Sequence, residues 1–143
     1  MNNTIESAVG VLIINEKGEL LLVRSFKEFD RWVIPGGHIS YGEKSIDCAK
    51  REAREEVRLD LHTLEFLNIK ESITKRINTE GTIENRHFIF INYVAKLANS
   101  DQKVVVDNCE LQDYAWIDPK KALKFEGVSK DIRELITFYL KGK

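Results

Sequence analysis

The sequence predicts a mixed α/β fold in which a β-sheet lies between layers of helices. Strand-like apolar stretches occur in both halves of the chain, an amphipathic helix lies between them, and a second amphipathic helix ends the chain. The 143 residues, with a hydrophobic content of 43%, are sufficient to bury a core. We therefore expect one domain over residues 1–143.

Two apolar runs begin the chain at residues 7–14 and 19–24, and Gly18 lies in the polar turn between them. Glycine readily adopts the positive φ that such a turn requires, so the two runs are expected to form a β-hairpin. Residues 25–33 are polar with interleaved aromatic side chains, which is typical of a loop, and the PGG cluster at 35–37 ends this segment.

Apolar residues at intervals of three and four then predict a helix over residues 43–57, whose buried face carries Ile46, Ala49, Ala53 and Val57. Farther along, β-branched and aromatic residues predict four strands and two helices. The strands are expected at 64–77, at 85–97 beyond a turn with Gly81, and on either side of a polar turn within 104–118; the helices are a short one near Pro119 and one over 129–141 capped by Ser129.

Composition excludes several classes of protein. A net charge of −1 gives no reason to expect binding to nucleic acid or to an anionic membrane. No apolar run approaches the roughly 20 residues that span a bilayer, and the N-terminus lacks the basic start of a signal peptide. Cys48 and Cys109 have no CxxC or Cys/His neighbours, so free thiols in a reducing cytoplasm are expected.

The predicted helix concentrates carboxylates on one flank. At about 100° per residue, Glu56 lies about 60° from the buried stripe, Glu52 about 100° and Glu55 about 160°. Glu52 and Glu56 form a like-charged pair late in the helix, where both their repulsion and the helix dipole are unfavourable. A solvated, glutamate-rich helix is one interpretation, and a cation site is the other. Oxygen ligands would select a hard ion such as Mg²⁺ or Mn²⁺.

The spacing favours the cation site. Glu43 follows Gly37 after five residues, Arg51 follows after seven more, and residues 51–56 read REAREE. This stretch resembles the Nudix box, Gly-x5-Glu-x7-Arg-Glu-(aliphatic)-x-Glu-Glu-x-Gly-(aliphatic). The upstream hairpin, the PGG cluster and a downstream Trp–acidic–Pro segment also occur where the Nudix family has them, so the resemblance covers most of the chain. It implies the Nudix-type α/β/α sandwich, with the box helix packed on a mixed sheet.

The sequence departs from the box at two positions. Ala53 occupies an aliphatic position, which should only loosen packing. Arg58 occupies the position of the glycine. If residue 58 takes the left-handed conformation that ends the helix, a side chain there costs about 1 kcal/mol. Neither change removes a carboxylate.

The resemblance implies a hydrolase that cleaves a diphosphate linked to another group with the help of Mg²⁺, with Mn²⁺ as the alternative ion. It makes Glu52, Glu55 and Glu56 metal ligands, with a backbone carbonyl at Gly36 as a further ligand. Glu43 and Gly37 would support them, and Arg51 would orient a carboxylate through a charge-assisted hydrogen bond.

Two candidates lie outside the box. Glu110, six residues before Trp116, matches a carboxylate position of MutT-like members and is expected to be a further base or metal ligand. A solvated turn residue is the alternative, and Asp107 and Asp113 are its competitors. Arg24, at the end of the second apolar run, is expected to bind a substrate phosphate, unless it is simply solvated.

The segment ELQDYAWIDPKKAL resembles the nucleoside-triphosphatase branch of the family. The proline typical of the ADP-ribose branch and the tyrosine typical of the dinucleoside-polyphosphate branch are absent from residues 70–78. We therefore expect a MutT-like enzyme that converts a (deoxy)nucleoside triphosphate to the monophosphate and pyrophosphate. The alternatives are an ADP-ribose or nucleotide-sugar pyrophosphatase and a nucleotide-binding module without catalysis. A homodimer is possible by analogy with the family.

Overall fold

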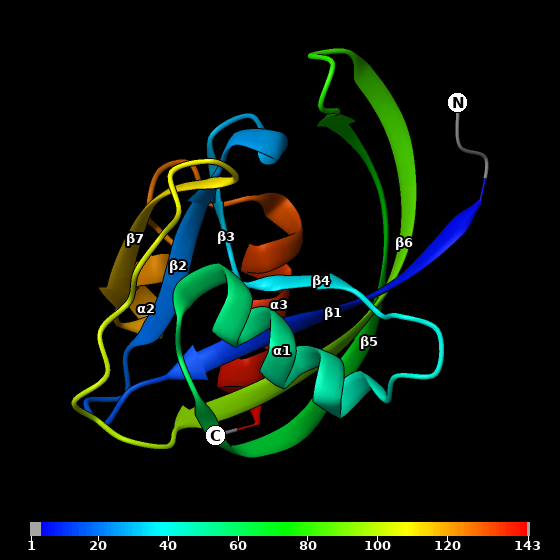
Figure 1. Ribbon diagram of the computed structural model, residues 1–143. Coiled ribbons are helices and arrows are strands. Elements are labelled where there is room, and N and C mark those ends of the chain that lie inside the picture. The colour runs from blue at the N-terminus through cyan, green and yellow to red at the C-terminus, as the bar shows by residue number, and fades with distance from the viewer. Residues whose placement is uncertain (1–3, 143) are drawn as a thin grey trace.

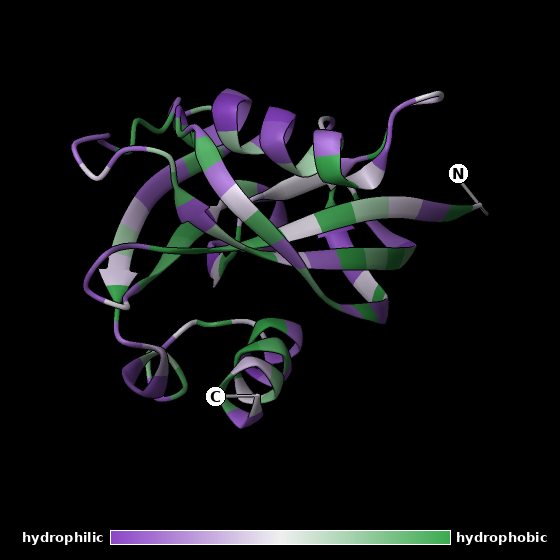
Figure 2. Ribbon diagram, turned by 90° about the horizontal axis from the view of Figure 1, so that it is seen from below, coloured by the Kyte–Doolittle hydropathy of each residue, from purple (hydrophilic) through white to green (hydrophobic). Residues whose placement is uncertain are grey.

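The computed structural model describes residues 4–142 and has three layers (Figure 1, Figure 2). Helix α1 (Ser45–Val57) covers one face of a seven-stranded sheet, and α2 (Pro119–Ala122) and α3 (Lys130–Lys141) cover the other. The predicted α/β/α sandwich is therefore confirmed. None of the helices within residues 4–142 has the length and apolar character needed to cross a bilayer.

The sheet is mixed, as expected. Its strands are β1 (Ile5–Ile14), β2 (Leu20–Ser25), β3 (Arg31–Val33), β4 (Gly36–His38), β5 (Leu61–Ile77), β6 (Ile83–Leu97) and β7 (Leu111–Ile117). The order is β3-β2-β1-β6-β5, with β4 beside β1 and β7 beside β2. β1 runs parallel to β6, and the other pairs are antiparallel.

Strands β1 and β2 separate directly after the turn that joins them. Gly18 has the expected positive φ of 79°, but the two strands pair only at Ile14 and Leu20. The middle of β1 pairs instead with β4, and β2 pairs with β3 and β7. The predicted hairpin is thus correct at its turn only. The opening between β1 and β2 is where the pocket described below is found.

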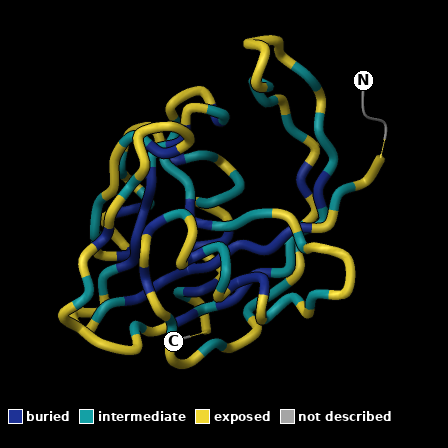
Figure 3. Tube along the Cα trace, viewed as in Figure 1, coloured by how far each residue is buried: buried dark blue, intermediate teal, exposed yellow. Residues whose placement is uncertain are grey.

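Two hydrophobic cores lie on the two faces of the sheet, because successive side chains of a strand point to opposite sides. The core under α1 contains Val9, Val11, Ile13, Leu21 and Val23, and the core under α3 contains Leu12, Ile14, Leu20 and Leu22. The helix stripe is as predicted, since Ala49, Ala53 and Val57 are fully buried in the first core and Ile46 packs against it. Figure 3 shows these buried segments at the centre of the molecule.

The β5–β6 hairpin is a long arm that curls away from the rest of the sheet (Figure 1). It reaches the short 3-10 helix η1 (Phe26–Glu28), where Arg76 of β5 forms an ion pair with the buried carboxylate of Glu28. The Arg76 guanidinium also lies 4.5 Å from the centre of the Phe88 ring on β6. The arm therefore closes one side of the space next to β4.

Two segments differ from the expected elements. The predicted loop at 25–33 contains η1 and strand β3, because Phe29 and Asp30 both adopt positive φ and turn the chain back onto β2. Glycine is the usual signal for such a turn, and neither residue is glycine. The valine run at 104–106 is not a strand. Val105 donates a backbone hydrogen bond of 3.1 Å to Val57, and Val104 is buried in the core under α1.

Arg58 adopts the left-handed conformation anticipated from its position, with φ 61° and ψ 34°. Its amide donates to Arg54 and that of Leu59 to Ala53, which is a Schellman-type helix end. We expect Arg58→Gly to raise the free energy of unfolding by about 1 kcal/mol, because glycine adopts this conformation without a Cβ clash. Urea denaturation measures the change. Arg58→Ala, which keeps the Cβ, is the control and should stay within about 0.5 kcal/mol of the parent.

A second stability prediction concerns the ion pair between Glu6 of β1 and Arg86 of β6, whose side chains are 10% and 17% exposed. Hydrogen bonding to Arg86 lowers the pKa of Glu6 to about 2, and His38 contributes in the same direction. Because the folded-state pKa lies below the unfolded value of 4.5, the pair stabilises the fold above pH 4.5 and loses this effect as pH falls towards 2.

Glu6→Gln should therefore cost about 1 kcal/mol at pH 7 after solvent screening, and the difference from the parent should shrink as pH falls from 5 to 2. Unfolding by urea over this pH range measures it. Glu84→Gln removes the other carboxylate that Arg86 contacts, at 3.1 Å, and serves as the matched control with a smaller effect. A Glu6→Gln difference that is constant with pH would contradict the assignment.

Candidate active site

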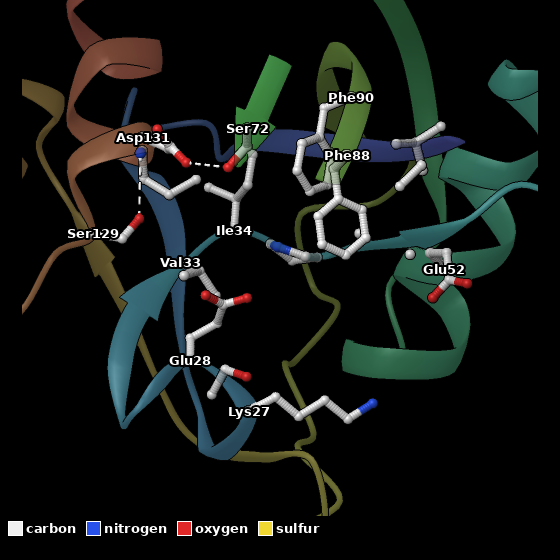
Figure 4. Close-up of a pocket in the computed structure, with 18 of the residues that line it drawn as sticks. Lys27, Glu28, Val33, Ile34, Glu52, Ser72, Phe88, Phe90, Ser129 and Asp131 are labelled. Carbon is white, nitrogen blue, oxygen red and sulfur yellow. Dashed lines mark hydrogen bonds between the residues drawn. The ribbon is translucent and has the colours of Figure 1, made fainter. Parts of the chain in front are cut away.

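A pocket of about 720 Å³ reaches from α1 to the beginning of α3, along the opening between β1 and β2 (Figure 4). At one end it is lined by Arg51, Glu52 and Glu56 of α1, by Gly36 and Gly37, and by Lys27 and Glu110. At the other end it is lined by side chains of β5, β6 and α3. One end of the pocket is thus rich in carboxylates, and the other combines aromatic and apolar side chains with Lys70, Arg76, Lys130 and Asp131.

Glu56 is partly buried at the carboxylate-rich end of the pocket. The amide of Gly36 donates a hydrogen bond of 2.8 Å to its Oε1 atom. Burial raises the pKa of Glu56 to about 8, and the negative charges of Glu52 and Glu110 act in the same direction. A buried carboxylate beside two others is a costly arrangement unless a cation or a proton compensates it.

Glu52 packs directly on the backbone of Gly37. A Cβ on Gly37 would fall well inside van der Waals distance of the Glu52 carboxylate, so only glycine leaves room for this side chain. Burial raises the pKa of Glu52, and the neighbouring Arg51 opposes this rise. The two adjacent glycines therefore differ in what they contribute here. Gly36 donates a hydrogen bond through its amide, and Gly37 leaves space for a carboxylate.

Arg51 connects the carboxylates of the box. Its Nε donates to Glu43 at 2.8 Å, and its Nη1 donates to Glu52 at 3.0 Å and to Glu55 at 2.9 Å. The same guanidinium reaches the backbone carbonyl of His38. Hydrogen bonding to Arg51 lowers the pKa of Glu43 to about 2. These hydrogen bonds agree with the expected role of Arg51 in orienting the carboxylates.

Glu55 and Glu110 differ in where they point. Glu55 is 53% exposed, bound to Arg51 and outside the pocket lining. Glu110 lines the pocket, and Lys27 of η1 donates to its Oε1 atom at 2.7 Å. Asp107 accepts from the amides of the turn before β7, including that of Glu110. Asp107 is therefore a turn residue, and of the three acidic candidates near Trp116 only Glu110 faces the pocket.

Arg24 is not brought to the glutamates. It follows Leu20 and Leu22 on the α3 face of β2 and does not line the pocket. Its guanidinium lies 6.0 Å from the centre of the Trp32 ring, and that ring packs edge-to-face on Phe125. This placement gives no support to a phosphate contact by Arg24.

The acidic residues fit a hard divalent ion in their chemistry. Every side-chain ligand atom that they offer is a carboxylate oxygen. Burial raises the pKa of both Glu52 and Glu56, so a cation beside them would offset the cost of keeping them charged. Within residues 4–142, no three acidic, His or Cys side chains converge closely enough to form a metal site as they stand. Arg51 contacts both Glu52 and Glu55 in this arrangement.

Comparison with known sequences identifies the family of this chain. A family model described as the NUDIX domain matches residues 4–138. The chain belongs to the NUDIX family. A curated Nudix relative, nucleoside triphosphatase NudI of Escherichia coli O81 (strain ED1a), is 29% identical over 98 residues, which are 67% of this chain and 67% of that protein. The chain is therefore a Nudix hydrolase, as the spacing of the box predicts.

Solved structures show the same Nudix fold. The MutT protein of Methanosarcina mazei Go1 superposes with a TM-score of 0.77 at 21% identity, covering 100% of this chain and 99% of that chain. The NUDIX domain of Shewanella oneidensis NrtR, solved in complex with ADP ribose, gives a TM-score of 0.76 at 17% identity and covers 99% and 90% of the two chains. At these identities the likeness concerns the fold.

Several pocket residues were not identified from the sequence. Lys27 lies in the segment expected to be a loop, and nothing in its neighbourhood distinguishes it from other surface lysines. Ser72 and Asp131 lie about 60 residues apart in sequence and meet only because the β5–β6 arm curls over α3. A sequence pattern has no signal for that meeting.

Proposed function

We propose that this Nudix hydrolase converts a (deoxy)nucleoside triphosphate to the nucleoside monophosphate and pyrophosphate, and that it requires Mg²⁺. The observation that carries the proposal is the pocket with two unlike ends. Glu52, Glu56 and Glu110 line one end, and Phe88 and Phe90 line the other. A triphosphate with its cations suits the first, and a flat base suits the second. The name of the NudI relative, nucleoside triphosphatase, agrees with this choice.

Glu52, Glu55 and Glu56 would hold the ion, together with the carbonyl of Gly36. A divalent ion bound there would neutralise phosphate oxygens and lower the pKa of an attacking water. Arg51 would have to share Glu52 and Glu55 with the ion, and its bidentate bond to Glu43 would keep it beside them.

Glu110 is the proposed general base. Its carboxylate would accept the proton of the water that attacks phosphorus, while Lys27, 2.7 Å away, keeps the carboxylate oriented towards the pocket. The water oxygen forms the new bond to phosphorus, the bridging P–O bond breaks, and its electron pair leaves with the departing phosphate group. Lys27 also places a positive charge beside the polyphosphate.

A substrate panel tests the proposal. We expect nucleoside triphosphates to yield monophosphate and pyrophosphate in the presence of Mg²⁺, and we expect chelation of the metal to stop the reaction. Products are separated by anion exchange, and reaction in ¹⁸O-labelled water shows which phosphorus is attacked. ADP-ribose and a nucleotide sugar are the comparison substrates, since the NrtR domain was solved with ADP ribose.

Rapid turnover of ADP-ribose or the nucleotide sugar with inert triphosphates would replace the proposed substrate by the alternative within the family. Full activity in the presence of excess chelator would contradict the metal requirement. Tight binding of triphosphates without any product would indicate a nucleotide-binding module. Each result therefore supports a different function for the same pocket.

A further inference from the structure

The short helix η1 is bonded both to the β5–β6 arm and to the turn that carries Glu110. On one side, Lys27 donates to the Glu110 side chain at 2.7 Å, and the amide of Phe26 donates to the Glu110 carbonyl at 3.0 Å. On the other side, Glu28 forms the ion pair with Arg76 of β5. Figure 4 shows Lys27 and Glu28 leaving η1 in different directions. The helix therefore connects the arm to the carboxylate proposed as the general base.

The two sides of this connection differ in burial. The Lys27 and Glu110 side chains are 42% and 51% exposed, and an ion pair between such exposed side chains holds weakly because water competes for both charges. The Glu28 and Arg76 side chains are only 11% and 22% exposed. A charge buried there is unfavourable without its partner, so this pair resists opening. The Arg76 guanidinium also lies against the ring of Phe88, which is 1% exposed. The firm anchor of η1 is therefore Glu28.

The backbone that follows η1 adopts an unfavourable conformation, so it depends on the contacts around it. Phe29 and Asp30 have φ values of 59° and 61°, in the left-handed region that residues with a side chain disfavour. Nε of Arg31 donates to the carbonyl of Glu28 at 2.9 Å and helps to hold the turn. A strained segment relaxes when a contact that holds it is removed. Loss of the Glu28 charge should therefore release η1 and, with it, the alignment of Glu110.

We propose that Glu28 is a positioning residue for the reaction. Its ion pair with Arg76 holds η1 against the arm, and η1 in turn holds the Glu110 carboxylate towards the pocket. This role rests on the proposed function, since Glu110 is taken as the general base. It adds a residue outside the box that acts through Glu110 and not on the reacting atoms. Because Glu28 itself lines the pocket, the test has to separate positioning from direct contact with the substrate.

Steady-state kinetics of Glu28→Gln, with the substrate that the panel above identifies, test the role. The amide keeps the size of the side chain and removes the charge that binds Arg76. We expect kcat to fall by about 10–10²-fold and KM to stay within about threefold, because the base is displaced while contacts to the substrate remain. Glu80→Gln is the matched control. It replaces an exposed acid in the turn at the end of the same arm, outside the pocket lining, and should reproduce the kinetics of the parent.

Combination with Glu110→Gln shows whether Glu28 acts through Glu110. If it does, Glu28→Gln should cause no further loss in a protein that already lacks the Glu110 carboxylate. Losses that multiply would show that Glu28 acts on the substrate directly and would overturn the proposal. Parental turnover in Glu28→Gln, with Glu110→Gln slow, would also overturn it and would leave the proposed reaction standing. Parental turnover in Glu110→Gln would refute the general base of the proposed function and the positioning role with it.

Hydrogen exchange tests the connection without substrate or metal. In Glu28→Gln, we expect amides of residues 26–30 and 107–111 to exchange at least about tenfold faster than in the parent, while those of β1 stay unchanged. Arg76→Gln, which removes the other partner of the ion pair, should produce the same pattern. Acceleration confined to residues 26–30 would show that η1 moves without the Glu110 turn and would overturn the proposal. Faster exchange in β1 of both variants would show a general loss of stability and would also overturn it.

Discussion

Glu56→Gln is expected to lower triphosphate turnover by about 10²–10⁴-fold while the protein stays folded. The side chain is partly buried and close enough to Glu52 and Glu110 for their negative charges to raise its pKa, so it is placed to bind a cation. The amide has the same shape and can still accept the hydrogen bond from Gly36, but it has lost the negative charge. Steady-state kinetics at saturating Mg²⁺ measure the loss.

The same variant makes a second prediction about stability without metal. The folded-state pKa of Glu56 is raised to about 8 from 4.5, so folding is favoured by its protonated form. The contribution of Glu56 to stability is therefore fully present below pH 4.5 and is lost as pH rises through 8. In the presence of a chelator, the parent should become progressively less stable than Glu56→Gln between these two pH values.

Asp47→Asn provides the control for Glu56→Gln. Asp47 lies in the first turn of the same helix, is exposed and does not line the pocket. Its replacement should leave turnover and its metal dependence unchanged. If Glu56→Gln kept the activity of the parent, or if it lowered activity only by unfolding the protein, Glu56 would not be part of the metal site.

Features that depend on local spacing could be predicted from the sequence. The period of Ala49, Ala53 and Val57 identified the buried face of α1, and Ser129 identified the start of α3, where it accepts from the Ile132 amide. The order of Gly37, the glutamates and Arg51 identified the box. Each of these patterns lies within one element or its immediate flanks, where helical geometry converts sequence spacing directly into spatial spacing.

Features that depend on long-range packing could not be predicted. β1 and β2 separate because β4 takes the place of β2 beside β1, and the residues of β4 that pair with β1 are 26 to 30 positions away in the sequence. Glu55 contacts Arg51 and is 53% exposed, which agrees with its helical angle of about 160° from the buried stripe, but that angle does not identify Arg51 as its partner. The partner of a charged side chain depends on all the charges around it, including those on other elements. A helical wheel shows only the direction in which each side chain leaves the helix.

Gly37→Ala is the second substitution with a large expected effect. Its new Cβ would meet the carboxylate end of Glu52, which is the flexible end of a long side chain and can move aside. Stability should therefore change by no more than about 1 kcal/mol. Displacing a catalytic group by about 1 Å costs about 10²-fold in rate, so turnover should fall by at least this factor. Thermal denaturation and steady-state kinetics of the same preparation separate the two effects.

Gly36→Ala gives the contrasting case, because its Cβ would meet the backbone carbonyl of Val9 in the β1–β4 ladder, which cannot move alone. This variant should lose about 1–3 kcal/mol of stability as well as activity. The route by which Gly37→Ala acts is tested by combining it with Glu52→Gln. If the alanine acts only by displacing Glu52, the double variant should be no slower than Glu52→Gln alone. Losses that multiply would show that Gly37 serves the reaction in another way, for example through its backbone.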